Sequence, residues 1–230
     1  MSRDRFSMKT EEFGVLESIT TWAAEGRLPE MLPTKQARSV KTAAALIGAG
    51  RQMLREMSLE ELSIDELCEE AGTTVGAFYR RFESKGDFFV TMQRVQTMRT
   101  EQSIRAFIAR HPPGQSSLEM LCEDIVHETV DNFRSNLGVM RASLQHSREG
   151  MWKVIKESGD RYRSMLVLLL TPYMDGIPVA ERQFRILFAY QALAGVLVHV
   201  VLNDPGPLSL GNKNIEKELL RLTHAYLTAK

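Results

Sequence analysis

Hydroxyl and basic side chains are concentrated in one short stretch of the sequence, AGTTVGAFYRRF at residues 71–82. Two threonines and a tyrosine offer hydroxyl groups, and two arginines follow the tyrosine directly. Hydroxyl and guanidinium groups donate hydrogen bonds to phosphate oxygens. Small residues such as Gly76 and Ala77 allow the backbone to approach a partner closely. This set of side chains is suited to contacting a phosphate backbone.

The flanking residues predict two short helices joined by a turn. Ser63-Ile-Asp-Glu66 is a capping box, which begins the first helix, and Gly72 stands where a helix commonly ends in the left-handed conformation. Thr74 is suited to cap a second helix over residues 75–82. Two helices joined by a short, glycine-containing turn form a helix-turn-helix, whose second helix enters the major groove of DNA.

The spacing within the second helix separates buried from exposed side chains. Phe78 and Phe82 lie four residues apart and are expected to face the core. Tyr79 and Arg80 then point toward a phosphate backbone. Because two arginines beside a tyrosine are costly to bury, we expect both Arg80 and Arg81 to be exposed.

Apolar residues follow helical spacing along nearly the whole chain, and no alternating strand pattern of useful length is present. The sequence therefore predicts an all-α fold, with a short leading helix and a linker before residue 34. The later helices are expected at about residues 34–57, 63–71, 75–82, 84–110, 117–135, 138–147, 151–171, 179–202 and 214–228. A second capping box, Ser84 with Asp87, begins the long helix to residue 110.

Composition limits the classes of protein. The chain has 230 residues, 43% of them hydrophobic, and a formal net charge of zero, so it suits one large or two modest soluble domains without an overall basic field. Cys68 and Cys122 fall on apolar helical stripes, which indicates buried thiols in a reducing cytosol. The apolar run at residues 186–202 falls short of a membrane span and favours a core or subunit-interface helix.

Signatures of enzymes are missing from the sequence. It contains no phosphate-binding Walker loop, no His-Glu-x-x-His and no Gly-x-Ser-x-Gly, and its histidines have no metal-ligand spacing. We therefore expect no catalytic residues, no cofactor and no metal.

The stretch LCEEAGTTVGAFYRRFESKGDFF resembles the DNA-binding region of the TetR family of transcriptional regulators. The matching positions, in the register of that family's pattern, are Leu67, Ala71, Gly72, Thr74, Gly76, Phe78, Tyr79, Phe82, Ser84, Lys85 and Phe88. Ser58 departs from the pattern, because a glycine normally ends the preceding helix there. Val75 also departs, and its apolar side chain would read a thymine methyl group.

The resemblance implies a sequence-specific DNA-binding regulator, a repressor released from a palindromic operator by a small apolar or amphipathic ligand. It implies a helix-turn-helix domain at residues 34–90, followed by a ligand-binding and dimerisation domain at 91–230. The partly disordered extension at 1–33 is longer than usual for the family, and it is either an arm that reaches DNA or a helix that packs on the domain. The implied partners are double-stranded DNA, a second copy of the chain and a small-molecule effector, in the cytoplasm and without a membrane. The candidate DNA contacts are Thr73, Thr74, Val75, Ala77, Tyr79, Arg80 and Lys85.

The C-terminal part carries the candidate ligand and dimer residues. Its large side chains on helical faces and a few polar ones are suited to line a pocket: Met120, His127, Met140, Trp152, Tyr162 and Met165. Residues 186–202 and 216–226 offer apolar faces for a four-helix interface between two copies. The first alternative is an all-helical protein-binding adaptor with a helix-turn-helix that does not bind DNA. An all-helical enzyme is the other alternative, and turnover of a metabolite would reveal it.

Overall fold

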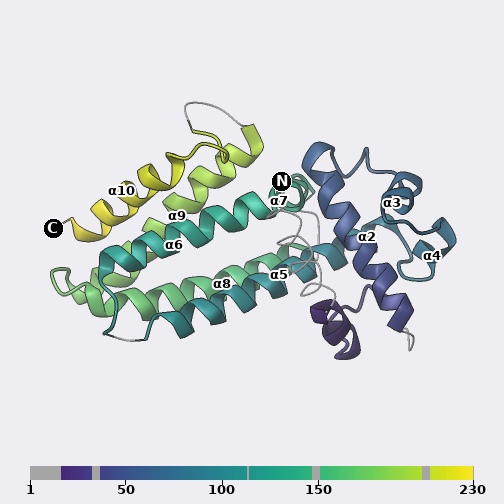
Figure 1. Cartoon of the computed structure of the whole chain (residues 1–230). Helices are drawn as coiled ribbons and strands as arrows, with labels where there is room; N and C mark the ends of the chain where they lie inside the picture. Colours follow the sequence, from purple (N-terminus) through teal and green to yellow (C-terminus); the bar gives the residue numbers. More distant parts are fainter. Residues whose placement is uncertain (1–16, 33–36, 113, 147–150, 204–207, 230) are drawn as a thin grey trace, which may run out of the picture. The chain divides into compact units, whose positions relative to one another are not determined.

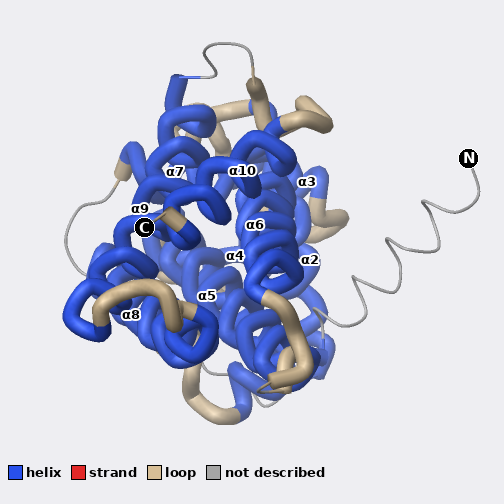
Figure 2. Tube along the Cα trace, turned by 90° about the vertical axis from the view of Figure 1, so that its left-hand side faces the viewer, coloured by secondary structure: helices blue, strands red, loops and turns tan. Residues whose placement is uncertain are grey.

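The computed structural model describes residues 17–32, 37–112, 114–146, 151–203 and 208–229. Every regular element in these ranges is a helix, as Figures 1 and 2 show, which confirms the all-α prediction. The chain divides into two compact units. Unit 1 comprises Met1–Met98 with Ala142–Ser147, and unit 2 comprises Arg99–Arg141 with Arg148–Lys230. The units divide within a helix, whereas the predicted domain boundary at residue 90 stays a prediction.

Unit 1 contains a short helix at residues 17–24, then α2 (Ala37–Glu56), α3 (Ile64–Glu70), α4 (Val75–Tyr79) and the first part of α5 (Lys85–Arg110). The residues ahead of position 17, where we expected partial disorder, lie outside the described part. Helix α4 is shorter than predicted. It ends at Tyr79, where the bonding tightens to a 3-10 turn, because the backbone N–H of Arg81 donates to the carbonyl of Phe78 three residues earlier at 2.7 Å.

Aromatic rings form the centre of unit 1. Phe78, Phe82 and Phe88 are fully buried, and their ring centroids lie 5.2–5.7 Å apart in tilted and edge-to-face pairs. Gly50 of α2 allows this packing, because a Cβ atom there would lie 2.7 Å from Cζ of Phe88. The prediction that Phe78 and Phe82 face the core is confirmed.

Unit 2 contains the end of α5, then α6 (Leu118–Ser135), the start of α7 (Leu137–Gln145), α8 (Met151–Leu170), the short 3-10 helix η1 (Thr171–Tyr173), α9 (Val179–Asn203) and α10 (Ile215–Thr228). Helix α10 packs against α6 and α9, and α8 packs against α9. Serine begins α6 as its N-cap, since Ser117 Oγ accepts from the backbone N–H of Met120 at 3.2 Å.

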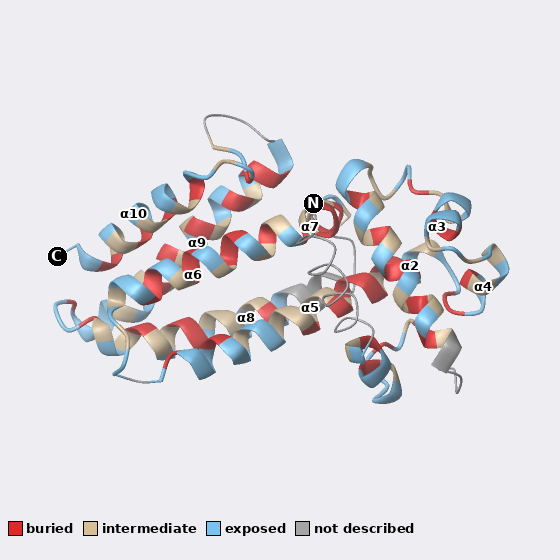
Figure 3. Cartoon of the chain, viewed as in Figure 1, coloured by how far each residue is buried: buried red, intermediate tan, exposed pale blue. Residues whose placement is uncertain are grey.

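Helix α9 is apolar on both its inner and its outer side. Its inner residues include Ile186, Leu193 and Leu197, which are at most 1% exposed. On the outer side, α9 and α10 present a set of side chains that we call the apolar α9–α10 face: Phe184, Phe188, Val196, Leu202, Leu222 and Tyr226. Buried and exposed residues alternate along both helices in Figure 3.

Helix α9 is the one described helix that is long and apolar enough to cross a membrane, by length and composition alone. Core helices of soluble proteins also meet this criterion.

Both cysteines are buried free thiols, as predicted. Burial raises the pKa of the Cys122 thiol to about 12, so this sulfur stays protonated and unreactive at neutral pH.

Candidate functional site

The turn between α3 and α4 is fixed by its own backbone. Gly72 adopts a φ of 60°, which confirms the predicted left-handed helix end. The N–H of Thr73 donates to the carbonyl of Cys68 at 2.8 Å, and the N–H of Gly72 donates to that of Glu69 at 3.0 Å. This pair of bonds is a Schellman motif, which ends α3 and sends the chain into α4 at a defined angle.

Helix α4 begins at a threonine cap. Thr74 Oγ1 accepts from the N–H of Ala77 at 3.2 Å, as the sequence predicts. Only the oxygen of the hydroxyl is used in this bond, so its hydrogen stays available to an outside acceptor. Thr74 is exposed, and Thr73, Val75 and Ala77 are partly exposed beside it.

Gly76 lies on the open side of α4. A Cβ atom at this position would meet nothing within 4 Å, and the backbone is not in the left-handed region. Neither packing nor backbone conformation in unit 1 therefore requires glycine there.

The two arginines after Tyr79 have different environments. Tyr79 is 50% exposed and Arg80 is exposed, as predicted. Arg81 is only 9% exposed, so the prediction that both arginines are exposed is wrong for this one. Its guanidinium donates to Ser39 Oγ of α2 at 2.5 Å, which offsets part of the cost of burial.

Lys85 is held inside unit 1. Its ammonium donates to the backbone carbonyls of Leu59, Glu60 and Leu62 at 2.9, 3.2 and 3.0 Å. These bonds engage all the donors of an ammonium group and fasten the α2–α3 loop to the start of α5. The predicted phosphate contact of Lys85 stays a prediction. In the structure, Lys85 also stabilises the fold of unit 1 through these hydrogen bonds.

The same loop explains the departure at Ser58. The N–H of Ser58 donates to the Glu61 carboxylate at 2.8 Å, and the N–H of Glu61 donates to Ser58 Oγ at 3.3 Å. This reciprocal pair satisfies backbone groups after α2 without a glycine.

Two family models match the chain over most of its length. One describes bacterial regulatory proteins of the tetR family and matches residues 46–92. The other describes a tetracyclin repressor-like C-terminal domain and matches residues 117–227. The chain belongs to the TetR family. Its helix-turn-helix and its helical C-terminal unit are therefore those of a DNA-binding transcriptional regulator, and such regulators are generally not enzymes.

Solved structures share this fold at low sequence identity. A proposed transcriptional regulator from Pseudomonas aeruginosa PAO1 is 19% identical with a TM-score of 0.59, over 80% of this chain and 88% of that one. A TetR-family regulator from Streptomyces coelicolor is 15% identical with a TM-score of 0.56, over 80% of each chain. A TetR/AcrR-family regulator from Thermobifida fusca YX-ER1 is 16% identical with a TM-score of 0.58, over 81% and 97%. A comparison with curated proteins found no match.

The candidate ligand residues of this TetR-family chain are spread over unit 2. Met120 is 53% exposed and Met140 partly exposed, whereas Met165 is buried. Tyr162 packs against Tyr190 with centroids 5.0 Å apart, and burial raises the pKa of its phenol to about 12. The side chain of Trp152 lies outside the described part.

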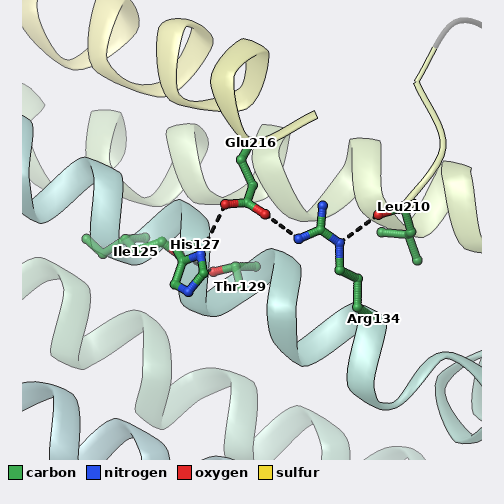
Figure 4. Close-up of polar contacts among 6 residues, drawn as sticks. All are labelled: Ile125, His127, Thr129, Arg134, Leu210 and Glu216. Carbon is green, nitrogen blue, oxygen red and sulfur yellow. Dashed lines mark hydrogen bonds and ion pairs between the residues drawn. The ribbon is translucent and has the colours of Figure 1, made fainter. Parts of the chain in front are cut away.

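His127 belongs to a polar cluster between α6 and α10. Its Nδ1 lies 3.0 Å from a carboxylate oxygen of Glu216, whose other oxygen pairs with Arg134. Arg134 also donates from Nε to the carbonyl of Leu210 at 2.6 Å. Figure 4 shows Glu216 pointing between the two basic side chains. The hydrogen bond to Glu216 raises the pKa of His127, and the pair joins α6 to α10. The predicted ligand contact of His127 stays a prediction.

A small cavity of about 10 Å³ lies among α6, α8, α9 and α10, and none of the predicted ligand residues lines it. Its walls include Cys122, Leu166, Tyr190 and Leu193. Thr223 also lines it, is only 4% exposed, and its Oγ1 has no hydrogen-bond partner among the described residues. Neither the role of Thr223 nor the burial of Arg81 was predicted, because the residue type of a threonine or an arginine gives no sign of what packs against it.

Proposed function

We propose that this TetR-family chain is a repressor that binds a pseudo-palindromic operator as a homodimer and releases it when a small effector binds unit 2. It would act in the cytoplasm, where the DNA is. The observation that supports DNA binding is the open outer face of α4. There, exposed polar side chains surround Gly76, and neither packing nor backbone conformation requires glycine at that position.

On this face, Thr74, Val75 and Ala77 would meet base edges. Thr73, Tyr79 and Arg80 would bind phosphate oxygens beside them, together with Lys85 if its ammonium also reaches the duplex. Gly76 would let the backbone approach the groove closely, which is what major-groove entry by the start of a recognition helix requires. Hydroxyl and guanidinium groups are common phosphate donors.

The apolar α9–α10 face supports the homodimer. Phe184 and Phe188 stack with centroids 6.0 Å apart, and Phe188 lies 5.2 Å from Tyr226, so the rings form a row across both helices. Phe184 is 66% exposed in the single chain. Gly195 of α9 is exposed, and a Cβ atom there would meet nothing within 4 Å, which allows a second helix to come close. A second copy would cover the row in a four-helix interface and set two α4 helices about 34 Å apart.

The small cavity supports an effector in unit 2. Its apolar walls suit an apolar molecule, and the unpartnered hydroxyl of Thr223 suits one hydrogen-bonding oxygen on that molecule. A cavity of about 10 Å³ has room for roughly one water, so the effector would have to push helices apart. Helices α5 and α7 each contribute residues to both units, so they would carry such a movement to α4.

The deciding experiment selects genomic fragments with the purified full-length chain and measures their affinity by fluorescence anisotropy. We expect an inverted repeat, and affinity that falls with salt at a log–log slope of roughly −0.9 per phosphate neutralised. The adaptor alternative predicts a dimer that enriches no sequence.

Two variants of α4 separate DNA contact from folding. Gly76→Ala should leave the chain at least as stable, because alanine is the better helix former by about 0.5–1 kcal/mol, while operator affinity falls because of the added methyl group. Tyr79→Phe should weaken binding to all duplexes alike. If both variants bind the operator like the unchanged protein, α4 is not the DNA-contacting helix.

The effector proposal needs its own test. A compound screen by thermal shift, followed by gel shift of the hits on the selected operator, measures coupling between the two units. A coupling of ~1–3 kcal/mol would weaken operator binding by roughly 5–150-fold, and DNA must weaken effector binding equally. Hits that bind unit 2 without changing operator affinity would refute induction.

A further inference from the structure

Residues 17–32 lie ahead of the region that matches the family model, which begins at residue 46. They nevertheless belong to the core of unit 1. Ile19, Trp22, Leu28 and Met31 are between 0 and 6% exposed. Four buried apolar side chains hold this segment of 16 residues in one position, because returning them to water would be unfavourable.

A polar anchor joins the same segment to α5. Arg94 places Nε 2.8 and 2.7 Å from the two carboxylate oxygens of Glu30, and a second guanidinium nitrogen lies 2.7 Å from the first of them. The two side chains are only 30% and 18% exposed. A charged pair with several short bonds and partial burial fixes direction as well as distance.

A backbone anchor joins the segment to the end of α4. The N–H of Leu32 donates to the carbonyl of Arg81 at 2.7 Å. The N–H of Arg81 donates to the carbonyl of Phe78 at 2.7 Å, and its guanidinium reaches Ser39 of α2. Arg81 therefore connects the last turn of α4 to both α2 and the N-terminal segment.

We infer that residues 28–32 form a brace that orients the recognition helix α4, so that this N-terminal segment is part of the DNA-reading machinery. The inference rests on the proposed DNA-binding function. Helix α4 has five residues, far fewer than a helix needs to hold its own shape in water. Its direction must therefore come from its surroundings: Phe78 packs in the core of unit 1, the α3–α4 turn holds the first end, and the brace holds the second.

Breaking the brace should cause a loss of sequence preference in DNA binding. Contacts to phosphates tolerate a small tilt of α4, whereas contacts to base edges need a fixed angle. Weakening the brace should therefore reduce the preference for the operator over unrelated DNA more than it reduces binding to DNA in general.

The test uses full-length Glu30→Gln and the reciprocal swap of Glu30→Arg with Arg94→Glu. Anisotropy titrations on the selected operator and on an unrelated duplex give the discrimination ratio of each variant. We expect Glu30→Gln to lower that ratio about fivefold or more, which is roughly 1 kcal/mol, and the swap to restore it at least in part. Glu25→Gln is the matched control, because it removes the exposed pair with Arg27 within the same segment.

Folding and docking are followed separately. With Trp152→Phe as background, Trp22 is the sole tryptophan, and its emission reports whether the segment stays packed. A packed, folded Glu30→Gln variant with unchanged discrimination overturns the brace, even if its melting temperature falls. An unchanged protein that shows no operator preference refutes the proposed function instead, so the two failures are distinguishable.

Discussion

The outer face of α4 and the apolar α9–α10 face are both open in a single copy of the chain, but their chemistry is opposite. Around Gly76, the α4 face presents the exposed polar groups of Thr74, Tyr79 and Arg80. The α9–α10 face presents a row of aromatic rings that includes Phe184 and Phe188. The first suits a hydrated, charged duplex and the second suits another protein surface. On the proposed function, DNA would bind unit 1 and a second copy of the chain would bind unit 2.

Both units combine local capping bonds with polar bonds between residues far apart in the sequence. In unit 1, capping bonds join residues only three positions apart, such as Ser63 with Glu66 and Ser84 with Asp87. In unit 2, Glu216 pairs with Arg134 across 82 positions. Local capping bonds fix where a helix begins and ends, whereas distant bonds depend on how whole helices pack.

The largest expected effect comes from charging the α9–α10 face. Gly195→Arg should give a monomer at micromolar concentration, because a guanidinium cannot be buried in an aromatic interface without a partner. Losing the second half-site should weaken operator binding by roughly 10²–10⁴-fold. Sedimentation velocity and anisotropy measure the two results. Leu168→Arg is the control, since Leu168 is 79% exposed but lies on α8; a dimeric Gly195→Arg variant would contradict the proposed interface.

The second-largest expected effect concerns Lys85, and it tests whether this residue stabilises the fold or contacts DNA. Lys85→Met keeps the aliphatic stem but leaves the carbonyls of the α2–α3 loop without their donor, so we expect a loss of about 1.5–3 kcal/mol in unfolding free energy. Urea denaturation measures it, and operator affinity should fall with it. Tyr79→Phe is the comparison, because it should alter affinity alone. If Lys85→Met keeps its unfolding free energy, and its operator affinity depends on salt as if about one phosphate fewer were neutralised, then Lys85 contacts only the duplex.

Replacing either of two threonines of unit 2 by valine should change the unfolding free energy, but in opposite directions. Thr223 Oγ1 is buried without a partner among the described residues, whereas Thr129 Oγ1 donates to the carbonyl of Ile125 at 2.6 Å. Thr223→Val should therefore raise the unfolding free energy by about 1 kcal/mol, and Thr129→Val should lower it by a similar amount. Urea denaturation of both variants checks the signs. A destabilised Thr223→Val variant would indicate that a water occupies the cavity and bonds this hydroxyl.

The sequence predicted the helix-turn-helix well because its signals are local. Gly72 ends α3 and Thr74 caps α4 in the structure, and both are visible as residue types at fixed spacing. The positions of the helices in unit 2 were also predicted, since turns and prolines mark their ends. The side chains that meet across helices were not. Arg81 and Ser39 are far apart in sequence, and nothing in the residue type of Arg81 distinguishes it from its exposed neighbour Arg80.

The smallest expected effect concerns pH and the polar cluster of unit 2. The hydrogen bond to Glu216 is the main reason that the pKa of His127 is raised above 6.5, and partial burial opposes it. Because the folded pKa lies above the unfolded value, the stability from this pair is fully present below pH 6.5. This contribution is lost as the pH rises through the folded pKa of His127.

The His127–Glu216 pair is exposed, with the His127 side chain at 61%, so its contribution to the unfolding free energy is about 0.2–0.5 kcal/mol. His127→Gln should melt about 1 °C lower than the unchanged protein at pH 5.5 and equally at pH 8.5. His199→Gln is the matched control, since His199 bonds Asn203 rather than a carboxylate. A melting difference that grows toward alkaline pH would show that the charged form of His127 does not stabilise the α6–α10 contact.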